Sequence, residues 1–149
     1  MITFDKIIFV CTGNTCRSPM AEAIYRNITE DSQLPAESRG IVVLFPEPSN
    51  PKADMVLSNH NLALEGHVSR QLEGEDITAD TLVLTMTERQ KLHVLETYPI
   101  SENVFTLKEY NGESGDVVDP YGGTLVDYED CYNELIRLIK KTVYKLDEA

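Results

Sequence analysis

The chain has 149 residues, about the length of one domain, and 42% of them are apolar and 26% charged. Twenty-five acidic residues against 13 basic ones give a formal net charge of −12, which disfavours binding to nucleic acid or an anionic membrane, since both are polyanions. No apolar run approaches the ~20 residues that span a bilayer. We therefore expect residues 1–149 to form a single globular domain that binds neither nucleic acid nor membrane.

The N-terminus and the cysteines favour the cytoplasm. Residues 1–6 lead straight into a short apolar stretch and lack the basic start and cleavage site of a signal peptide. The three cysteines are an odd number, which argues against a secreted disulfide framework. No group of Cys, His, Asp or Glu has the spacing of a zinc site. We expect a cytoplasmic protein that needs no metal or other cofactor, and we favour a monomer.

Short apolar runs predict buried strands, and apolar residues at helical spacing predict helices between them. The predicted strands are residues 7–10, 82–86 and 104–107, with a weaker candidate at 37–43. The predicted helices begin near Pro19, at Asn50-Pro51, at a capping box from Thr87 to Gln90, and before Tyr128. We expect the second helix to end at Gly66 and the third near Pro99. This alternation indicates a parallel sheet covered on both faces, whose ligands bind beyond the carboxyl ends of the strands.

The turn after the first predicted strand has the composition of an anion-binding loop. It reads Cys11-Thr12-Gly13-Asn14-Thr15-Cys16-Arg17-Ser18-Pro19. Gly13 and Asn14 tolerate positive φ, so successive backbone N–H groups can point inward, and the following helix adds its positive end. Arg17 can hold two phosphoryl oxygens with its planar guanidinium. Cys11 then lies at the floor of an electropositive bowl, which stabilises a thiolate nucleophile.

Each part of this pattern is weak alone. A cysteine that ends a strand is more often a small buried hydrophobic residue. The combination with a glycine-bearing loop, Arg17 and a helix start favours the catalytic interpretation of Cys11. The nucleotide-binding P-loop is excluded, because it requires Gly-Lys-Ser/Thr and this loop has no lysine.

The run from Val10 to Glu22 resembles the signature of the low-molecular-weight protein-tyrosine phosphatase family. Residues 38–41 resemble its second strand, 66–70 the segment after its second main helix, and 119–123 its acid loop. The resemblance implies a three-layer α/β fold: a four-stranded parallel sheet with helices on both faces and a phosphate-binding loop after strand 1. It also implies a metal-independent hydrolase of phosphorylated proteins that forms a phosphocysteine intermediate.

The resemblance assigns catalytic roles to Cys11, Arg17 and Asp119. Cys11 attacks phosphorus, and Arg17 binds the phosphoryl oxygens together with the loop. The residues of that loop are Thr12, Gly13, Asn14, Thr15, Cys16, Arg17 and Ser18. Asp119, which Pro120 keeps out of the α region, protonates the leaving atom and then activates water. The alternative for Asp119 is an ordinary turn aspartate.

By the same resemblance, four residues brace the loop: Asn14, Ser18, Ser38 and His67. Ser18 also holds the Cys11 thiolate; the alternatives are an ordinary helix N-cap for Ser18 and a half-exposed loop histidine for His67.

For the remaining cysteines and histidines, the expected roles and positions are simpler. Cys16 lies close to the thiolate of Cys11, and the family forms a reversible, protective disulfide there. Cys131 lies on the apolar stripe of the last helix and is expected in the core. His60 and His93 are expected on the surface of helices, without partners.

Thr15 and Tyr121 are the candidate selectivity residues. Tyrosine-directed members of the family usually carry an apolar residue at the position of Thr15, whereas a bacterial branch that acts on phosphoarginine resembles this loop. A small polar Thr15 suits a phosphoguanidinium, Tyr121 can stack on a guanidinium or a ring, and Asp119 can bind the guanidinium. We favour phosphoarginine, with phosphotyrosine as the alternative. Two minor alternatives are an arsenate reductase, which needs a relay of further thiols, and a non-catalytic phosphate-binding module.

Overall fold

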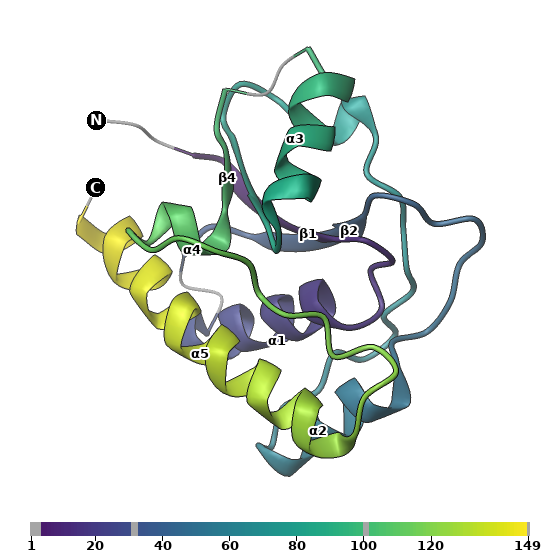
Figure 1. Cartoon of the computed structure of the whole chain (residues 1–149). Coiled ribbons are helices and arrows are strands. Elements are labelled where there is room, and N and C mark those ends of the chain that lie inside the picture. Colours follow the sequence, from purple (N-terminus) through teal and green to yellow (C-terminus); the bar gives the residue numbers. More distant parts are fainter. Residues whose placement is uncertain (1–3, 31–32, 100–101, 149) are drawn as a thin grey trace.

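The computed structural model describes residues 4–30, 33–99 and 102–148 (Figure 1). The expectation drawn from the N-terminus rests in part on residues 1–3, which lie outside the described residues. Four parallel strands form one sheet in the order β2-β1-β3-β4. Their bounds are β1 Lys6–Cys11, β2 Ala36–Gly40, β3 Thr81–Thr85 and β4 Val104–Thr106. The predicted four-stranded parallel sheet is confirmed, with β2 three residues shorter at its end than expected.

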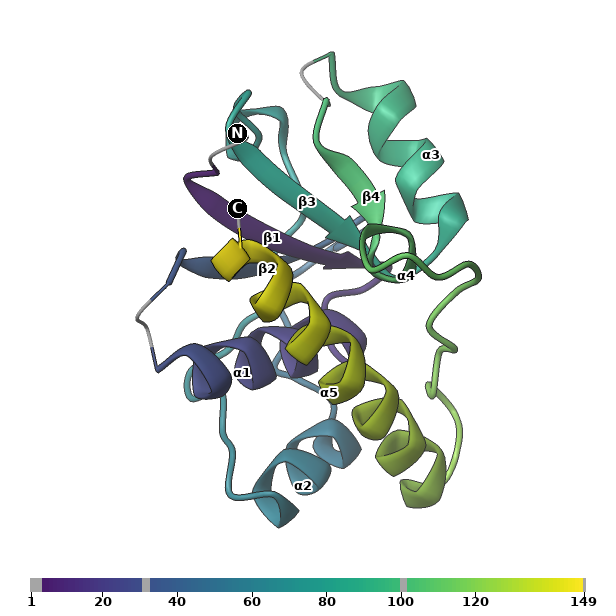
Figure 2. The ribbon, with the colours of Figure 1, turned by 90° about the vertical axis from the view of Figure 1, so that its left-hand side faces the viewer.

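Helices cover both faces of the sheet, as predicted (Figure 2). One face carries α1 (Arg17–Thr29) and α5 (Leu125–Glu148), with α2 (Pro51–Asn59) packed beside them, and the other carries α3 (Glu88–Thr97). The side chains of β1 alternate between the two layers. Ile7 and Phe9 join the larger buried cluster, whereas Ile8 and Val10 join the smaller one. No described helix is long and apolar enough to cross a membrane.

The second predicted helix ends earlier than expected. It ends at Asn59, because Asn61 takes a left-handed φ of 60° and Leu62 N–H donates to the Leu57 carbonyl at 2.8 Å. This bond pattern is a Schellman-type helix end, with asparagine in the position where glycine is commonest. The termination assigned to Gly66 is therefore wrong.

The histidine after α2 is not the isolated surface residue that we expected. The His60 ring stacks on Tyr132, with centroids 4.0 Å apart, and its Nε2 pairs with Glu129. Both partners lie on α5, so His60 ties the end of α2 to that helix. His93 is exposed on α3, as predicted.

Two short helices were missed. α4 (Leu107–Tyr110) follows β4 directly, and the 3₁₀ helix η1 (Gly74–Asp76) precedes β3. Thr106 caps α4, because its Oγ1 accepts from Glu109 N–H at 2.9 Å. In turn, Glu109 Oε1 accepts from Thr106 N–H at 3.3 Å. This capping box ends the run that we expected to continue as a strand to residue 107.

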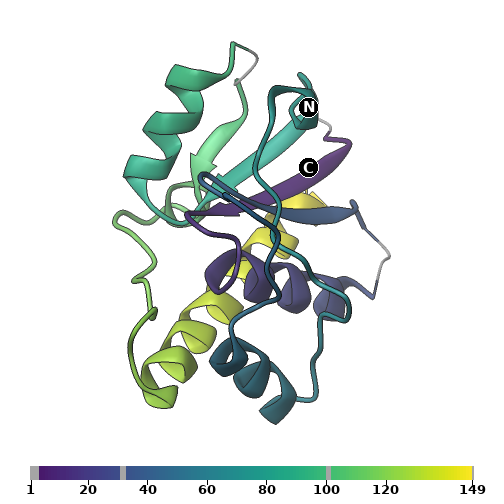
Figure 3. The same ribbon diagram turned by 90° about the vertical axis from the view of Figure 1, so that its right-hand side faces the viewer.

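The proline-rich chain after β2 runs beside the chain between α2 and η1 (Figure 3). Ser69 N–H donates to the Glu47 carbonyl at 2.8 Å, and Val43 N–H donates to Gln71 Oε1 at 3.1 Å. The two segments support each other next to the carboxyl end of β2.

Candidate active site

The candidate site lies where β1 ends and the loop of residues 12–16 leads into α1. In the strand order, the connection that leaves β1 leads to β2 on one side and the connection that leaves β3 leads to β4 on the other, so the strand order reverses between β1 and β3. Open α/β sheets bind ligands at this point, beyond the carboxyl ends of the strands.

The loop turns its backbone carbonyls toward the protein and leaves its N–H groups open. The carbonyls of Cys11, Thr12 and Thr15 accept from the backbone N–H groups of Ile41, Val42 and Asn50, at 3.0, 3.0 and 2.8 Å. No N–H of residues 12–16 donates to an acceptor among the described residues. A run of open N–H groups at a helix start is an anion nest. Asn14 supplies the left-handed conformation, with φ 58°, whereas Gly13 does not adopt a positive φ.

Ser18 contacts the candidate nucleophile. Its Oγ lies 2.9 Å from Cys11 Sγ, and both residues are buried. Asn14 Nδ2 donates to the same Oγ at 2.9 Å, so the Ser18 proton is available for the sulfur, with the Arg39 carbonyl as a longer contact at 3.4 Å. Ser18 is not the N-cap of α1, because that position belongs to Cys16.

Asn14 is the centre of the bracing network. Its carbonyl accepts from His67 Nε2 at 2.8 Å, and its Oδ1 accepts from Arg70 N–H at 3.0 Å. His67 thus contacts the loop, as predicted. Ser38 does not: its Oγ is buried on β2 and has no hydrogen-bond partner in the part of the chain that the structure describes. The expected hydrogen bond from Ser38 is wrong, because the Asn14 side chain bonds Ser18 Oγ and Arg70 N–H instead.

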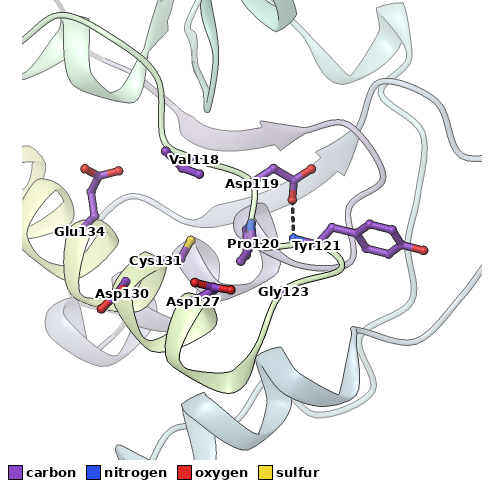
Figure 4. Close-up of a pocket in the computed structure, with 9 residues that line it drawn as sticks. All are labelled: Val118, Asp119, Pro120, Tyr121, Gly123, Asp127, Asp130, Cys131 and Glu134. Atoms are coloured by element: carbon purple, nitrogen blue, oxygen red, sulfur yellow. Dashed lines mark hydrogen bonds between the residues drawn. The ribbon is translucent and has the colours of Figure 1, made fainter.

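Arg17 and Asp119 come together from opposite ends of the chain. Arg17 NH1 donates to the Val117 carbonyl at 2.9 Å, and NH2 lies 3.5 Å from Asp119 Oδ2. The other carboxylate oxygen of Asp119 accepts from Tyr121 N–H at 3.0 Å. The exposed Tyr121 ring points away from α5 (Figure 4). Arg17 therefore links the phosphate-binding loop to the acid loop.

Cys16 faces the α5 side of the loop. Its Sγ lies 3.5 Å from the hydroxyl of the buried Tyr128 and 3.9 Å from Thr15 Oγ1. Burial raises the pKa of the Cys16 thiol, while its bonds to Tyr128 and Thr15 act in the opposite sense. Burial also raises the pKa of the Cys131 thiol to about 12, so Cys131 is the core residue that we expected.

A hollow of about 470 Å³ lies between the acid loop and the first half of α5 (Figure 4). Its lining residues are Val118, Asp119, Pro120, Tyr121, Gly123, Asp127, Asp130, Cys131 and Glu134. None of them belongs to the phosphate-binding loop. The hollow lies beside the candidate site and is not the place where a phosphoryl group would meet Cys11.

Two residues that support the site were missed. A Cβ on Gly40 would lie 2.9 Å from the Thr12 carbonyl and 3.1 Å from Asn14 Cβ, so the loop approaches β2 more closely than a side chain permits. Gln90 Nε2 donates to Thr12 Oγ1 at 3.0 Å. The capping box at Gln90 was recognised in the sequence, but a capping pattern does not reveal a second contact.

Within the described ranges, no group of three or more His, Cys, Asp or Glu side chains could hold a metal ion.

Known proteins match nearly the whole chain. The family profile described as low molecular weight phosphotyrosine protein phosphatase matches residues 6–149. The protein-arginine-phosphatase of Bacillus subtilis (strain 168) is 41% identical over 145 residues, which cover 94% of this chain and 95% of that protein. The low molecular weight protein-tyrosine-phosphatase PtpB of Staphylococcus aureus is 42% identical over 136 residues, which cover 91% of this chain and 95% of PtpB.

A solved structure of the YwlE arginine phosphatase, a cysteine-to-serine mutant with a phosphorylated active-site serine, superposes with a TM-score of 0.90. It is 39% identical and covers 95% of each chain. These relatives are named as protein phosphatases, which are hydrolases. The chain belongs to the low molecular weight phosphotyrosine protein phosphatase family.

Proposed function

We propose that residues 1–149 act as one cysteine-dependent phosphatase domain whose substrate is protein phosphoarginine. The observation that carries the proposal is the position of Cys11. Its sulfur lies 2.9 Å from the Ser18 hydroxyl, at the base of a loop whose N–H groups are open. Arg17 and Asp119, paired at 3.5 Å, stand at the same loop. This arrangement supplies a nucleophile, an oxyanion cradle and a proton donor.

In the first step, the Cys11 thiolate attacks phosphorus. The S–P bond forms as the bond from phosphorus to the leaving nitrogen or oxygen breaks, and Asp119 gives its proton to the leaving atom. Arg17 and the loop N–H groups hold the three equatorial oxygens as the phosphoryl group flattens. Arg17 first has to exchange its contact with Asp119 for a contact with the phosphoryl group.

In the second step, water attacks the phosphocysteine. Asp119, now a carboxylate, takes a proton from the water as the new P–O bond forms and the S–P bond breaks. The leaving group is the Cys11 thiolate, which the Ser18 hydroxyl stabilises by hydrogen bonding. Inorganic phosphate is released, and Asp119 is again protonated.

Two observations support phosphoarginine over phosphotyrosine. Thr15 is half-buried and places a hydroxyl in the loop, where a polar phosphoguanidinium gains more than an apolar aryl ring. One family relative is named a protein-arginine-phosphatase. PtpB, by contrast, is named a protein-tyrosine-phosphatase, and phosphotyrosine is the second candidate substrate on that account.

An arsenate reductase would need thiols in a relay after Cys11. The sequence holds only two other cysteines, and the Cys131 thiol is buried with a pKa of about 12. A thiol of that kind is a poor relay nucleophile. The thiol count therefore favours the phosphatase.

Parallel assays on a phosphoarginine peptide and a phosphotyrosine peptide test the proposal. Wild type should release phosphate from both, with the higher kcat/KM on phosphoarginine. Cys11→Ser should abolish turnover of both and retain phosphate binding, because an alcohol is not ionised near neutral pH and the loop N–H groups remain. Rapidly quenched wild type should carry phosphate on Cys11. Substantial turnover by the variant would overturn the mechanism, and a preference for phosphotyrosine would overturn the substrate assignment.

A further inference from the structure

The Gln90 side chain does more than cap α3. It is 5% exposed and lies in the first turn of the helix. Its Oε1 accepts from the N–H groups of Thr87 and Met86, both at 3.0 Å. Its Nε2 donates to Thr12 Oγ1, also at 3.0 Å. One carboxamide thus spans from the turn between β3 and α3 to the residue that follows Cys11.

The capping role does not explain why this residue is glutamine. Glutamate completes a capping box equally well, and its charge is favourable at a helix N-terminus. A carboxylate, however, has no N–H to donate. Only an amide can accept from Thr87 and Met86 while it donates to Thr12.

The bond from Gln90 restricts where the Thr12 hydroxyl proton can point, because that proton cannot lie between the two atoms of the bond. Because Thr12 Oγ1 accepts in this bond, its own proton is not used there, and that proton has no acceptor among the described residues. Thr12 is exposed, and its carbonyl is held by Val42 N–H at 3.0 Å. Its hydroxyl is therefore an oriented donor next to the open N–H groups of the loop.

The turn that Gln90 holds also supports the acid loop. Val117 N–H donates to the Met86 carbonyl at 2.9 Å, and the Val117 carbonyl accepts from Arg17 NH1 at 2.9 Å. Gln90 is bonded to Met86 on one side and to Thr12 on the other. Gln90 therefore fixes the position of the phosphate-binding loop relative to Val117, whose carbonyl holds Arg17.

We propose that Gln90 is a positioning residue that presents the Thr12 hydroxyl as a donor to the bound phosphoryl group. Its effect on turnover rests on the proposed function, whereas its effect on phosphate binding does not. Gln90→Glu is the sharpest variant, because it keeps the capping box and reverses the bond to Thr12. The Thr12 hydroxyl then donates to the carboxylate and is turned away from the ligand.

A double-mutant cycle separates this effect from the added charge. Wild type, Gln90→Glu, Thr12→Val and the double variant are compared for their affinity for inorganic phosphate and their kcat/KM on p-nitrophenyl phosphate. Gln90→Glu alone, with Thr12 unchanged, should weaken phosphate binding and lower kcat/KM about tenfold relative to wild type, as expected for a lost bond to a charged group. In the Thr12→Val background, only the effect of the added charge remains, so Gln90→Glu should weaken phosphate binding less than it does in wild type. The midpoint of thermal unfolding should stay near that of wild type in Gln90→Glu.

Thr12→Ser, which keeps the hydroxyl, should bind phosphate within about twofold of wild type, whereas Thr12→Val should not. Equal losses from Gln90→Glu in both backgrounds would overturn the proposal, because the residue would then act through charge or capping. If phosphate affinity shows the coupling but wild type hydrolyses no phosphorylated substrate, the proposed function fails and the positioning of Thr12 stands.

Discussion

Arg17 and Asp119 form an ion pair across 102 positions of sequence, with Arg17 NH2 3.5 Å from Asp119 Oδ2. The arginine side chain is 5% exposed and the aspartate side chain 51%, so the pair joins a fixed cation to a carboxylate at the surface. Arg17 is also held by the Val117 carbonyl, whereas Asp119 is held by its own turn. On the proposed mechanism, a phosphoryl group entering the loop competes with Asp119 for Arg17. Its binding would then release Asp119 for proton transfer at the step that needs the proton.

Asp119→Asn should remove the proton donor and leave the phosphate-binding loop intact. We expect kcat on phenyl phosphate to fall ~100-fold or more, the lower end of the range for general acid catalysis. A good leaving group such as 2,4-dinitrophenol needs little protonation, so its phosphate ester should lose much less. Affinity for inorganic phosphate should stay the same or rise, because Arg17 no longer has a competing carboxylate.

Asp130→Asn is the matched control, since Asp130 lines the hollow on the α5 side of the acid loop, whereas the carboxylate paired with Arg17 is that of Asp119. It should leave both kcat values near those of wild type. Equal losses on both esters in Asp119→Asn would mean that the residue acts on structure and not as the acid.

Oxidation by peroxide should be reversible through a Cys11–Cys16 disulfide. Peroxide converts the Cys11 thiolate to a sulfenic acid, and Cys16 then attacks its sulfur and releases water. The attacking group is the thiolate, and burial raises the pKa of Cys16 above its ordinary value of 9.0. The rate of disulfide closure should therefore keep rising as pH increases to 9 and beyond.

Mass mapping of samples quenched at several pH values measures this closure. Cys16→Ser should lose recovery by a thiol reductant, and Cys131→Ala should keep it, because the Cys131 thiol is buried outside the loop. Overoxidised Cys11 without a disulfide in wild type would contradict the switch.

Gly40→Ala should impair the site more than a neutral glycine replacement elsewhere. The new methyl group would lie 2.7 Å from Val43 Cγ2 and 2.9 Å from the Thr12 carbonyl, so the loop or its support has to shift. We expect a loss of ~1–3 kcal/mol in the free energy of unfolding, as for overpacking of a buried site, together with weaker phosphate binding. Gly74→Ala, where the nearest atom is Tyr98 Cδ1 at 3.6 Å, is the control. Full phosphate affinity in Gly40→Ala would show that the close approach is dispensable.

Most of the fold could be predicted because its patterns are local. The β-branched run that became β1 and the long apolar stripe of α5 are both defined within one element. The end of α2 was missed because asparagine, and not glycine, took the left-handed position at Asn61. α4 was missed although its capping box, Thr106 to Glu109, is present in the sequence. A three-residue strand followed at once by a cap cannot be told from a longer strand by periodicity.

The sequence predicts the parts of the candidate site that belong to a local motif. It does not predict the parts that depend on contacts between distant residues. The loop, Arg17 and His67 lie where the motifs indicated. Ser38 shares a motif, but its hydroxyl makes no hydrogen bond within the described residues, because position on a strand does not fix what faces a hydroxyl. The contact of Gln90 with Thr12 joins positions 78 apart and depends on the sheet bringing β1 beside β3. Such a contact has no local signature.

Thr15→Ile tests whether the loop selects phosphoarginine through size and polarity. Thr15 is half-buried, its Oγ1 lies 3.9 Å from Cys16 Sγ, and its carbonyl is held by Asn50 N–H. Isoleucine keeps the backbone bond, adds apolar bulk and removes the hydroxyl, so the phosphoryl chemistry at Cys11 should survive. A phosphoguanidinium would meet an apolar wall and lose a polar partner, at ~1–3 kcal/mol. That range corresponds to a fall of roughly five- to 140-fold in kcat/KM on a phosphoarginine peptide.

The same variant should hold or raise kcat/KM on a phosphotyrosine peptide, because an aryl ring loses no polar partner and gains packing. Thr15→Ser is the matched control: it keeps the hydroxyl without the added bulk and should retain the preference of wild type. The measurement is the ratio of kcat/KM on the two peptides, which cancels any general loss of active enzyme. A parallel fall on both substrates would assign Thr15 a structural role. An unchanged ratio in Thr15→Ile would place the selectivity elsewhere at the pocket mouth, with Tyr121 the next residue to change.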